Sequence, residues 1–208
     1  MADSDFGLLE AWRDGDLDAG TQLFERHFDR LYRFFRNKAG DDADDLVQQT
    51  FLACVRTRDR FRGDSSFRTY LFTVARSKLY NHFSSRQRKG GMIDLGVTSV
   101  ADLGVSMNRM IIRNEEHEIL LHALRRLPLD LQVALELHYF ENMRGPELAR
   151  VLEIPEGTVR SRLRRGREQL REELAKLTSS SERAESTMTN LEVWAEQIRD
   201  RILSPDPG

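Results

Sequence analysis

Hydrophobic side chains recur at intervals of three or four residues along most of this chain. That spacing is typical of α-helices that turn one face toward a core. Alternation of polar and apolar residues, the mark of a strand, is not sustained anywhere, so the pattern predicts an all-α protein. In the first part of the chain the periodic positions are Leu23, Phe24, Phe28, Leu31, Tyr32 and Phe35, then Leu46, Val47, Phe51 and Val55, then Leu71, Val74, Ala75 and Leu79.

The helical spacing fails in the middle of the chain, from residue 84 to about residue 113. This stretch holds four glycines and no continuous apolar face, which is typical of a flexible linker. Helical spacing returns at Ile119, stops at Pro128 and resumes at Leu131. We therefore predict two small helical domains joined by a flexible linker. The predicted parts are a first domain over 1–88, the linker over 89–112, a second domain over 113–177 and an extension over 178–208.

Composition excludes several classes of protein. The 208 residues include 32 Lys or Arg and 34 Asp or Glu, a formal net charge of −2. Cys54 is the only cysteine and no two histidines lie four positions apart, so we expect neither a disulfide framework nor a metal site. No apolar run is long enough to span a membrane, and the first ten residues are acidic rather than signal-like. We expect a reduced, cytoplasmic protein without a cofactor.

The near-neutral total hides an uneven distribution of charge. Residues 1–50 carry six basic and twelve acidic side chains, whereas residues 51–90 carry ten basic and two acidic ones. A second basic cluster lies near residue 160. Clustered basic residues are the electrostatic mark of nucleic-acid binding, while interspersed charges usually make a solvated surface.

Two short helices joined by a tight turn are predicted between residues 144 and 177. Pro146 suits the first turn of the first helix, where its missing N–H costs nothing. Leu148, Val151 and Leu152 form the inner face of that helix, and Pro155 precedes the second. The second helix has an apolar stripe, in which Gly166 allows a close approach by a neighbour. The members of the stripe are Val159, Leu163, Leu170, Leu174 and Leu177.

This second helix presents basic and small polar residues on its other face. Arg160, Arg164, Arg167 and Arg171 share one outer face by their spacing. A helix kept soluble by arginine would explain exposure alone, but acidic residues would serve equally, and none lies between Gly157 and Arg167. The arrangement is typical of a helix-turn-helix that binds duplex DNA.

The basic block over residues 56–89 interleaves cations with aromatic side chains. Single-stranded DNA is bound by such mixtures, because aromatic faces stack on bases while cations follow the phosphates. An inner stripe of Phe67, Leu71, Val74, Ala75 and Leu79 is expected to be core. The remaining aromatic residues, Phe72 and Phe83 among them, are expected to be exposed and to hold unstacked bases.

Both domains resemble the extracytoplasmic-function (ECF) sigma factors of bacterial RNA polymerase. The resemblance covers roughly residues 20–177. In the second domain it is carried by "PEGTVRSRLRRGREQL", which is similar to the family's −35-element-binding helix-turn-helix. In the first domain "DADDLVQQTFLACV" resembles the helix that docks on core RNA polymerase, and "DRFRGDSSFRTYLFTVARSKLYNHFSSRQRK" resembles the segment that captures and opens the −10 element.

The resemblance implies three sets of site residues. The set implied for binding core polymerase is Asp42, Asp44, Asp45, Leu46, Val47, Gln48, Gln49 and Phe51. The set implied for the −10 element is Arg62, Ser66, Arg68, Tyr70, Arg76, Lys78, Asn81, Arg86, Arg88 and Lys89. The set expected to bind the −35 element is Thr158, Arg160, Ser161, Arg162, Arg164 and Arg165. The resemblance also implies no catalytic residues, because nucleotide chemistry belongs to the polymerase.

Some positions depart from the family pattern. Tyr70, Ser77 and Asn81 replace the residues that are common there, so the promoter sequence cannot be inferred. Glu153 stands where the turn usually has glycine, and it must either adopt a left-handed conformation or mark a different turn.

Two other classes of protein are the alternatives to a sigma factor. "DDADD" contains the DDxxD pattern of prenyl-transfer enzymes, but a second metal motif is missing and the helices are too amphipathic to enclose a long apolar chain. A helix-turn-helix regulator that binds only duplex DNA is the second alternative. It would have little use for an aromatic and basic block suited to single strands.

The extension over 178–208 lies outside the resemblance. Its first ten residues are polar and are expected to be flexible. Thr189 and Glu192 form a candidate capping box for one helix, whose apolar face would hold Leu191, Trp194, Ile198 and Ile202. This helix either packs on its own domain or binds a partner. The sequence leaves open whether an anti-sigma factor or another regulator binds the chain.

Overall fold

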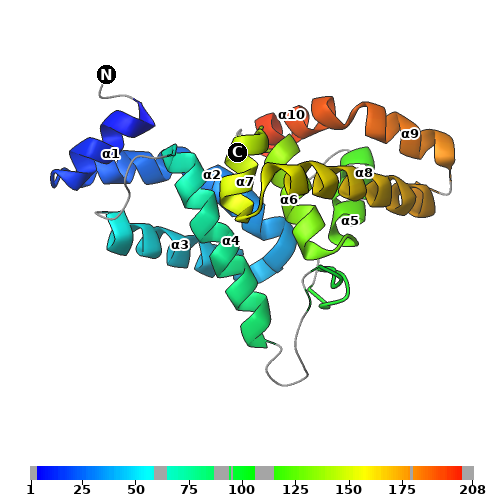
Figure 1. The fold of residues 1–208 in the computed structure, drawn as a ribbon, viewed down its shortest axis with the longest axis horizontal. Helices are drawn as coiled ribbons and strands as arrows, with labels where there is room; N and C mark the ends of the chain where they lie inside the picture. Colours follow the sequence, from blue (N-terminus) through cyan, green and yellow to red (C-terminus); the bar gives the residue numbers. More distant parts are fainter. Residues whose placement is uncertain are drawn as a thin grey trace, which may run out of the picture.

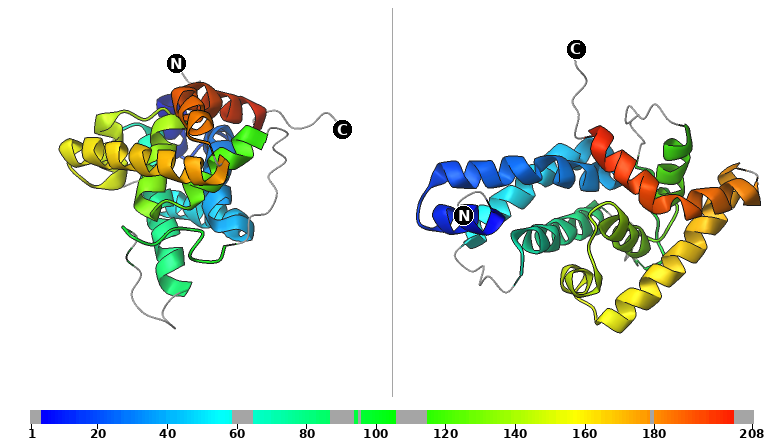
Figure 2. Two further views of the ribbon diagram at one scale, coloured as in Figure 1. Left: turned by 90° about the vertical axis from the view of Figure 1, so that its right-hand side faces the viewer. Right: turned by 90° about the horizontal axis from the view of Figure 1, so that it is seen from above.

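The computed structural model describes residues 4–58, 65–86, 94, 96–105, 115–178 and 180–202, and within these ranges the side chains of residues 86, 115 and 198–202 are outside the description. The described chain is built from helices in two units that lie against one another (Figure 1). The first unit contains α1 to α4. The second contains α5 to α8, with α9 and α10 folded back over it (Figure 2). The all-α prediction is confirmed.

The first two helices of the first unit begin at residues whose side chains cap them. Ser4 begins α1 by accepting a hydrogen bond from the Gly7 amide at 3.1 Å. Asp16 begins α2 by accepting from the Asp18 and Ala19 amides. The elements are α1 (Asp5–Arg13), α2 (Leu17–Ala39), the short 3-10 turn η1 (Gly40–Asp42), α3 (Ala43–Thr57) and α4 (Phe67–Arg86). No pattern in the sequence had singled out α1.

The core of the first unit uses more of α4 than the sequence predicts. Leu71, Ala75 and Leu79 are buried as expected. Phe72 and Phe83 are buried too, so the prediction that they are exposed for base stacking is wrong. Phe72 meets Phe34 of α2 edge to face, with ring centroids 5.5 Å apart. Because α4 has α2, α3 and α7 around it, a single stripe could not fill its buried surface.

The second unit follows the predicted helix-turn-helix closely. Its helices are α5 (Glu115–Arg125), α6 (Leu129–Tyr139), α7 (Gly145–Leu152) and α8 (Glu156–Thr178). Glu153 ends α7 in the left-handed conformation, with φ 55° and ψ 42°, as expected for a residue in place of glycine. At Gly166 a Cβ atom would lie 3.1 Å from Cγ of Leu135, so α8 crosses α6 at a distance that only glycine tolerates without adjustment.

Part of the predicted linker is anchored to the second unit. The Leu129 amide donates to the Thr98 carbonyl at 3.0 Å, and the Ala101 amide donates to the Arg125 carbonyl at 3.0 Å. Ser99 caps the short turn that follows through paired hydrogen bonds with Asp102. Over residues 96–105, therefore, the chain is hydrogen-bonded to the start of α6 and the end of α5.

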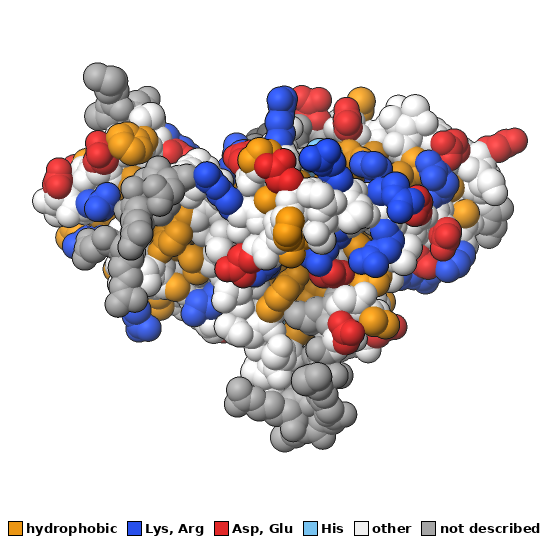
Figure 3. All heavy atoms as spheres, viewed as in Figure 1, with side chains coloured by type: hydrophobic (Ala, Val, Ile, Leu, Met, Phe, Trp, Pro, Cys, Tyr) orange, Lys and Arg blue, Asp and Glu red, His pale blue; other side chains and the backbone are white. Residues whose placement is uncertain are grey.

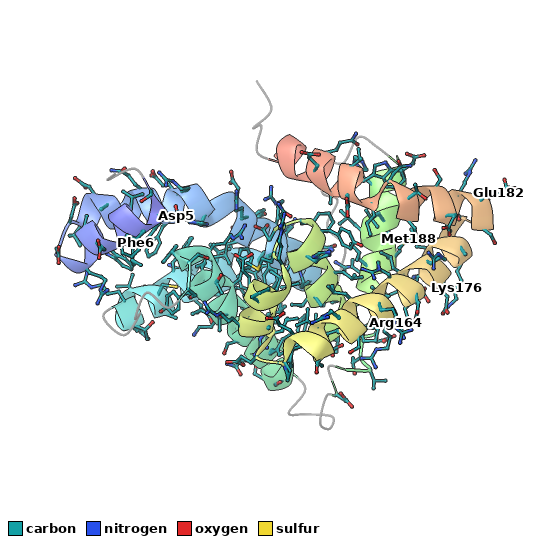
Figure 4. All side chains as sticks on the ribbon, turned by 45° about the horizontal axis from the view of Figure 1, so that its top comes forward. Asp5, Phe6, Arg164, Lys176, Glu182 and Met188 are labelled. Atoms are coloured by element: carbon teal, nitrogen blue, oxygen red, sulfur yellow. The ribbon has the colours of Figure 1, made fainter. Side chains whose placement is uncertain are left out.

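The extension contains two described helices, α9 (Ser181–Thr189) and α10 (Leu191–Ile202), where the sequence predicted a flexible stretch and one helix. Thr189 belongs to the end of α9, and its hydroxyl donates to the Glu185 carbonyl at 2.9 Å, so the predicted capping box is wrong. Ser180 instead starts α9 by accepting from the Arg183 amide. Figure 4 shows α9, which carries Met188, doubling back beside the part of α8 that carries Lys176.

The extension packs on its own domain. Leu191 and Ala195 of α10 and Ala184 of α9 are buried, and Trp194 meets His117 of α5 with ring centroids 5.8 Å apart. The sequence left open whether this helix packs on its own domain or binds a partner. The structure places α10 against α5 and α6, and α9 against α8.

Ending the chain after Thr178 is therefore expected to lower the free energy of unfolding by roughly 2–4 kcal/mol, from the apolar area that α9 and α10 cover. Thermal and urea denaturation measure this change. A chain ended after Ile202 is the control and should match the full chain. Equal stability of all three proteins would contradict the docked arrangement.

Candidate nucleic-acid interface

The N-terminal half of α8 presents most of the predicted −35 residues to solvent. Val159, Leu163 and Leu170 are buried against the rest of the second unit, which fixes the rotation of the helix. The opposite face is therefore turned outward, and Figure 3 shows blue side chains gathered over α8 on this face. The exposed predicted residues are Thr158, Arg160, Ser161, Arg164 and Arg165. Figure 4 labels Arg164 on this helix.

Contacts between neighbouring side chains of α8 leave the positive charge of this face available to DNA. Arg164 pairs with Glu168 one turn later, at 2.9 Å, and both side chains are well exposed. Such a pair contributes only a few tenths of a kcal/mol, so a phosphate can replace the carboxylate. Ser161 donates to the Thr158 carbonyl at 2.9 Å. An exposed row of arginine, threonine and serine at the start of a helix suits insertion into the major groove.

Arg162 differs from its neighbours. Its side chain is only 18% exposed, and its guanidinium lies 3.1 Å from the Asp130 carboxylate at the start of α6. Burial raises the pKa of Asp130, although Arg162 and Arg165 act in the opposite direction. Arg162 thus ties α8 to α6 in this structure, a positioning role that the sequence analysis did not predict.

Two of the predicted −10 residues of α4, Arg68 and Arg76, lie at the contact between the two units. Arg68 donates to the Glu141 carbonyl at 2.9 Å and to the Glu147 carboxylate at 2.8 Å. Arg76 donates to the Leu152 carbonyl and pairs with the Glu153 carboxylate. Asn81 is exposed and Lys78 is half-buried.

Two other −10 residues have structural partners inside the first unit. Ser66 accepts from the Thr69 amide at 3.1 Å and so caps the start of α4. The Tyr70 hydroxyl shares a hydrogen bond with Thr57 of α3, and burial raises its pKa. Cys54 is buried beside it, and burial raises the pKa of that thiol to about 12. Arg62, Arg88, Lys89 and the side chain of Arg86 lie outside the described residues.

Some of the residues predicted to bind core polymerase are buried in the hydrophobic core of the first unit, and others are exposed on α3. Leu46 and Val47 are 1% and 3% exposed, so the structure makes them core residues rather than contact residues. Asp44, Asp45, Gln48 and Gln49 are exposed. Phe51 is half-buried and stacks on Phe24 of α2 at 4.5 Å, and Asp42 lies 3.6 Å from His82.

Two apolar residues lie beside the exposed part of α3: Leu52, which the sequence analysis did not name, and Val55, which its periodic pattern turned toward the core. Leu52 is 48% exposed and Val55 is 42% exposed. They follow Gln48 by one and two helical turns, which was the available signal. An apolar pair next to a row of polar side chains is typical of a surface that binds another protein.

The described part of the chain shows neither a metal site nor a membrane span. No group of three or more histidine, cysteine, aspartate or glutamate side chains could hold a metal ion there. Among the same residues, no helix is both long enough and apolar enough to cross a membrane.

Comparison with known proteins assigns both units. Residues 23–89 match the family model for Sigma-70 region 2, and residues 117–170 match that for Sigma-70 region 4. The chain is 30% identical over 177 residues to the RNA polymerase sigma-H factor of Pseudomonas aeruginosa, covering 80% of this chain and 91% of that protein. The chain belongs to the ECF sigma factors of the sigma-70 family.

Other sigma factors support the assignment. The ECF RNA polymerase sigma-E factor of Haemophilus influenzae is 28% identical over 183 residues, covering 84% of this chain and 97% of that protein. Region 2 spans most of α2 and all of α3 and α4, while region 4 spans α5 to the middle of α8. Helices α9 and α10 follow the matched part of region 4.

Two solved structures share the fold. The structure of CnrH in complex with the cytosolic domain of CnrY matches with a TM-score of 0.59 and 25% identity, covering 81% of this chain and 95% of that one. The sigma factor RpoE of Bartonella quintana, in complex with the anti-sigma factor NepR, matches with a TM-score of 0.61 and 24% identity, covering 74% and 95%.

Proposed function

We propose that this ECF sigma factor binds core RNA polymerase, directs it to promoters and opens the −10 region. In this proposal α8 of region 4 recognises the duplex −35 element, and α4 of region 2 holds separated bases of the −10 element. The exposed part of α3 binds the polymerase. The chain itself is not an enzyme, because it contributes binding energy while the polymerase performs the chemistry. Its place of action is the cytoplasm, where the polymerase works.

The observation that carries this proposal is the presence of both modules in one chain and in sigma order. Region 4 alone would fit an ordinary helix-turn-helix regulator of duplex DNA. Region 2 does not fit that alternative, because it adds a second basic helix and an exposed patch on α3 that a duplex-binding regulator does not need. The regulator is therefore not favoured.

Binding energy is sufficient for opening a few base pairs. Stacking a base on an aromatic side chain is worth about 1–3 kcal/mol, which is similar to the cost of unstacking and unpairing it. Tyr70 is the described −10 residue with an aromatic ring, and Lys78 and Asn81 lie further along α4. A stacking contact by Tyr70, made together with phosphate contacts by the basic residues of this segment, supports opening without ATP.

An anti-sigma protein is a further partner class. Both solved structures compared above are complexes, and in one of them the bound partner is the anti-sigma factor NepR. We propose that this chain is also controlled by a protein that binds regions 2 and 4.

Run-off transcription with purified core polymerase tests the proposed function. Adding the chain to core should produce promoter-specific transcripts that core alone does not make. Replacing Gln48 and Gln49 by alanine, together with Leu52→Ser, should lower affinity for core by roughly ten-fold. This requires the three substitutions together to remove about 1.4 kcal/mol from the interface, within the range that a few truncated contact residues contribute. Native gel shift or sedimentation measures that affinity.

The matched control is the triple variant Glu10→Ala, Glu25→Ala and Leu17→Ser, which also changes exposed residues, on α1 and α2. It should bind core as the unaltered chain does. If the α3 variant bound core and directed transcription normally, the assignment of this surface would be wrong. If the unaltered chain directed no transcription from any genomic promoter, the proposed function itself would be wrong.

A further inference from the structure

Region 4 binds two arginines of α4 through carboxylate and carbonyl oxygens, which accept hydrogen bonds as the oxygens of a promoter phosphate would. Arg68 bridges the Glu147 carboxylate and the Glu141 carbonyl, and Arg76 bridges the Glu153 carboxylate and the Leu152 carbonyl. All four acceptors lie on α7 or close to its ends. We name this set, the carboxylates of Glu147 and Glu153 with the carbonyls of Glu141 and Leu152, the acidic clasp.

The clasp leaves little of either arginine to solvent. The side chains of Arg68 and Arg76 are 23% and 12% exposed. A guanidinium that donates to a carboxylate and a carbonyl has used the same fork of N–H groups that would bind a phosphate. A DNA strand and the clasp therefore cannot occupy these two arginines at once.

A buried ionic centre also joins region 2 to region 4, between α2 and α6. Lys38 is fully buried and pairs with the Glu136 carboxylate. Asn37 and Gln132 each donate to the other oxygen of that carboxylate at 2.8 Å, and Lys38 also donates to the Phe34 carbonyl at 2.7 Å. The ammonium and both carboxylate oxygens have partners across or beside the interface. The arrangement in which regions 2 and 4 lie against one another, called the closed arrangement below, is therefore specific rather than a loose contact.

More ionic contacts continue the same interface. The Glu141 carboxylate is buried and lies 3.7 Å from Arg33 and 3.9 Å from Arg30 of α2. Arg125 of α5 donates to the Asn37 carbonyl at 2.9 Å. The contact between regions 2 and 4 thus contains several charged pairs. Salt should weaken the more exposed pairs, Arg68–Glu147 and Arg76–Glu153, more than the buried ones.

The closed arrangement treats the two proposed DNA surfaces differently. Arg160, Arg164 and Arg165 of α8 remain exposed on the outside of the molecule, whereas Arg68 and Arg76 are covered. In Figure 1, α7 lies beside α4, while α8 lies further from it.

We infer that the acidic clasp is an intramolecular binding surface for α4, which withholds Arg68 and Arg76 from −10 DNA in the free chain while the −35 surface stays accessible. This inference rests on the proposed function for the identity of the DNA. Opening the contact between regions 2 and 4 then precedes, or accompanies, engagement of the −10 strand. The free chain binds single strands weakly for this reason.

The variant Glu147→Gln with Glu153→Gln tests the clasp while keeping size and hydrogen bonding. Its matched control is Glu172→Gln with Glu192→Gln, which removes the same charge from exposed positions elsewhere. Dyes on cysteines introduced at Thr21 of α2 and Ser186 of α9 report the distance between the units by energy transfer. Cys54 will not compete for label, because it is buried and its thiol pKa is raised to about 12.

At low salt we expect high energy transfer in the unaltered chain and in the control, and lower transfer in the clasp variant. Added salt should lower transfer in the unaltered chain as well. The clasp variant should also bind a mixed-sequence single-stranded oligonucleotide roughly five- to ten-fold more tightly than the control, because a larger fraction of molecules is open.

Two results would overturn the inference. One is equal energy transfer in the clasp variant and the control, which would show that the clasp does not hold the units together. The other is lower transfer without tighter single-strand binding, which would show that the covered arginines are not withheld from DNA. Neither result depends on polymerase. Failure of the unaltered chain in run-off transcription, with the energy-transfer change intact, would instead reject the proposed function alone.

Discussion

Replacing Arg160 and Arg164 by alanine is expected to weaken binding to a −35 duplex by roughly thirty-fold or more. A charged contact to a base edge or a phosphate is worth about 1–3 kcal/mol, and two such contacts are lost. Both side chains are exposed on α8, so the fold should not change. Fluorescence anisotropy with a labelled promoter duplex, over a series of salt concentrations, measures the affinity and its salt dependence.

The salt series distinguishes contacts to phosphates from contacts to base edges. Each lost phosphate contact should reduce the slope of log K against log salt concentration by about 0.9. Arg183→Ala is the matched control, since Arg183 is an exposed arginine of α9 away from this face. Unchanged affinity and slope in the double variant would mean that the arginines of α8 serve solubility and not DNA binding.

Phe72→Ala is expected to lower the free energy of unfolding of the chain by about 3–5 kcal/mol, because the ring is fully buried against Phe34. Had Phe72 been an exposed base-stacking residue, the same change would affect promoter opening and leave stability nearly unchanged. Urea denaturation, followed by circular dichroism, measures the loss.

Two companion variants sharpen the result. Phe72→Leu keeps most of the apolar volume and should cost less than half as much as Phe72→Ala. Phe28→Ala makes the same truncation at a ring that is 42% exposed, and should cost about 1 kcal/mol or less. Equal losses for Phe72→Ala and Phe28→Ala would contradict the buried position of Phe72.

The helix-turn-helix was predictable because its signals are local. Pro146, Glu153 and Gly166 each act within a turn of their own position, or through the close approach that a missing Cβ allows. The stripe from Val159 to Leu174 is buried as its helical period predicts, and that period fixes which face of α8 is turned inward. The outward face of α8, and with it most of the −35 set, follows from that one rotation.

Contacts distant in the sequence were not predictable from a single chain. Lys38 meets Glu136 across 98 positions, and nothing in the helical period of α2 marks Lys38 as buried. In the same way Phe72 and Phe83 lie off the main stripe of α4, and only the helices packed on its other sides bury them. Leu46 and Val47 were predicted to contact the polymerase, although they are buried in the core of their own unit.

The extension shows a third reason why part of the structure could not be predicted from the sequence. "SERAESTMT" lacks a strong apolar stripe, so its sequence favours a flexible stretch. Helix α9 forms because Ala184 and Thr187 pack on the second unit and Arg171 of α8 pairs with Glu185 at 2.9 Å. Tertiary contact decides the structure of such a segment where local propensity is weak.

Permanganate reactivity of promoter thymines is the most direct test of the central claim, which is that this chain gives core RNA polymerase the ability to open a promoter. With core and chain together, and without ATP, we expect a short block of reactive thymines around the −10 position. Core alone and the chain alone should leave the duplex unreactive. Binding of the chain to the duplex with no reactive thymines in the presence of core would contradict the account, and would indicate a regulator that recognises double-stranded DNA only.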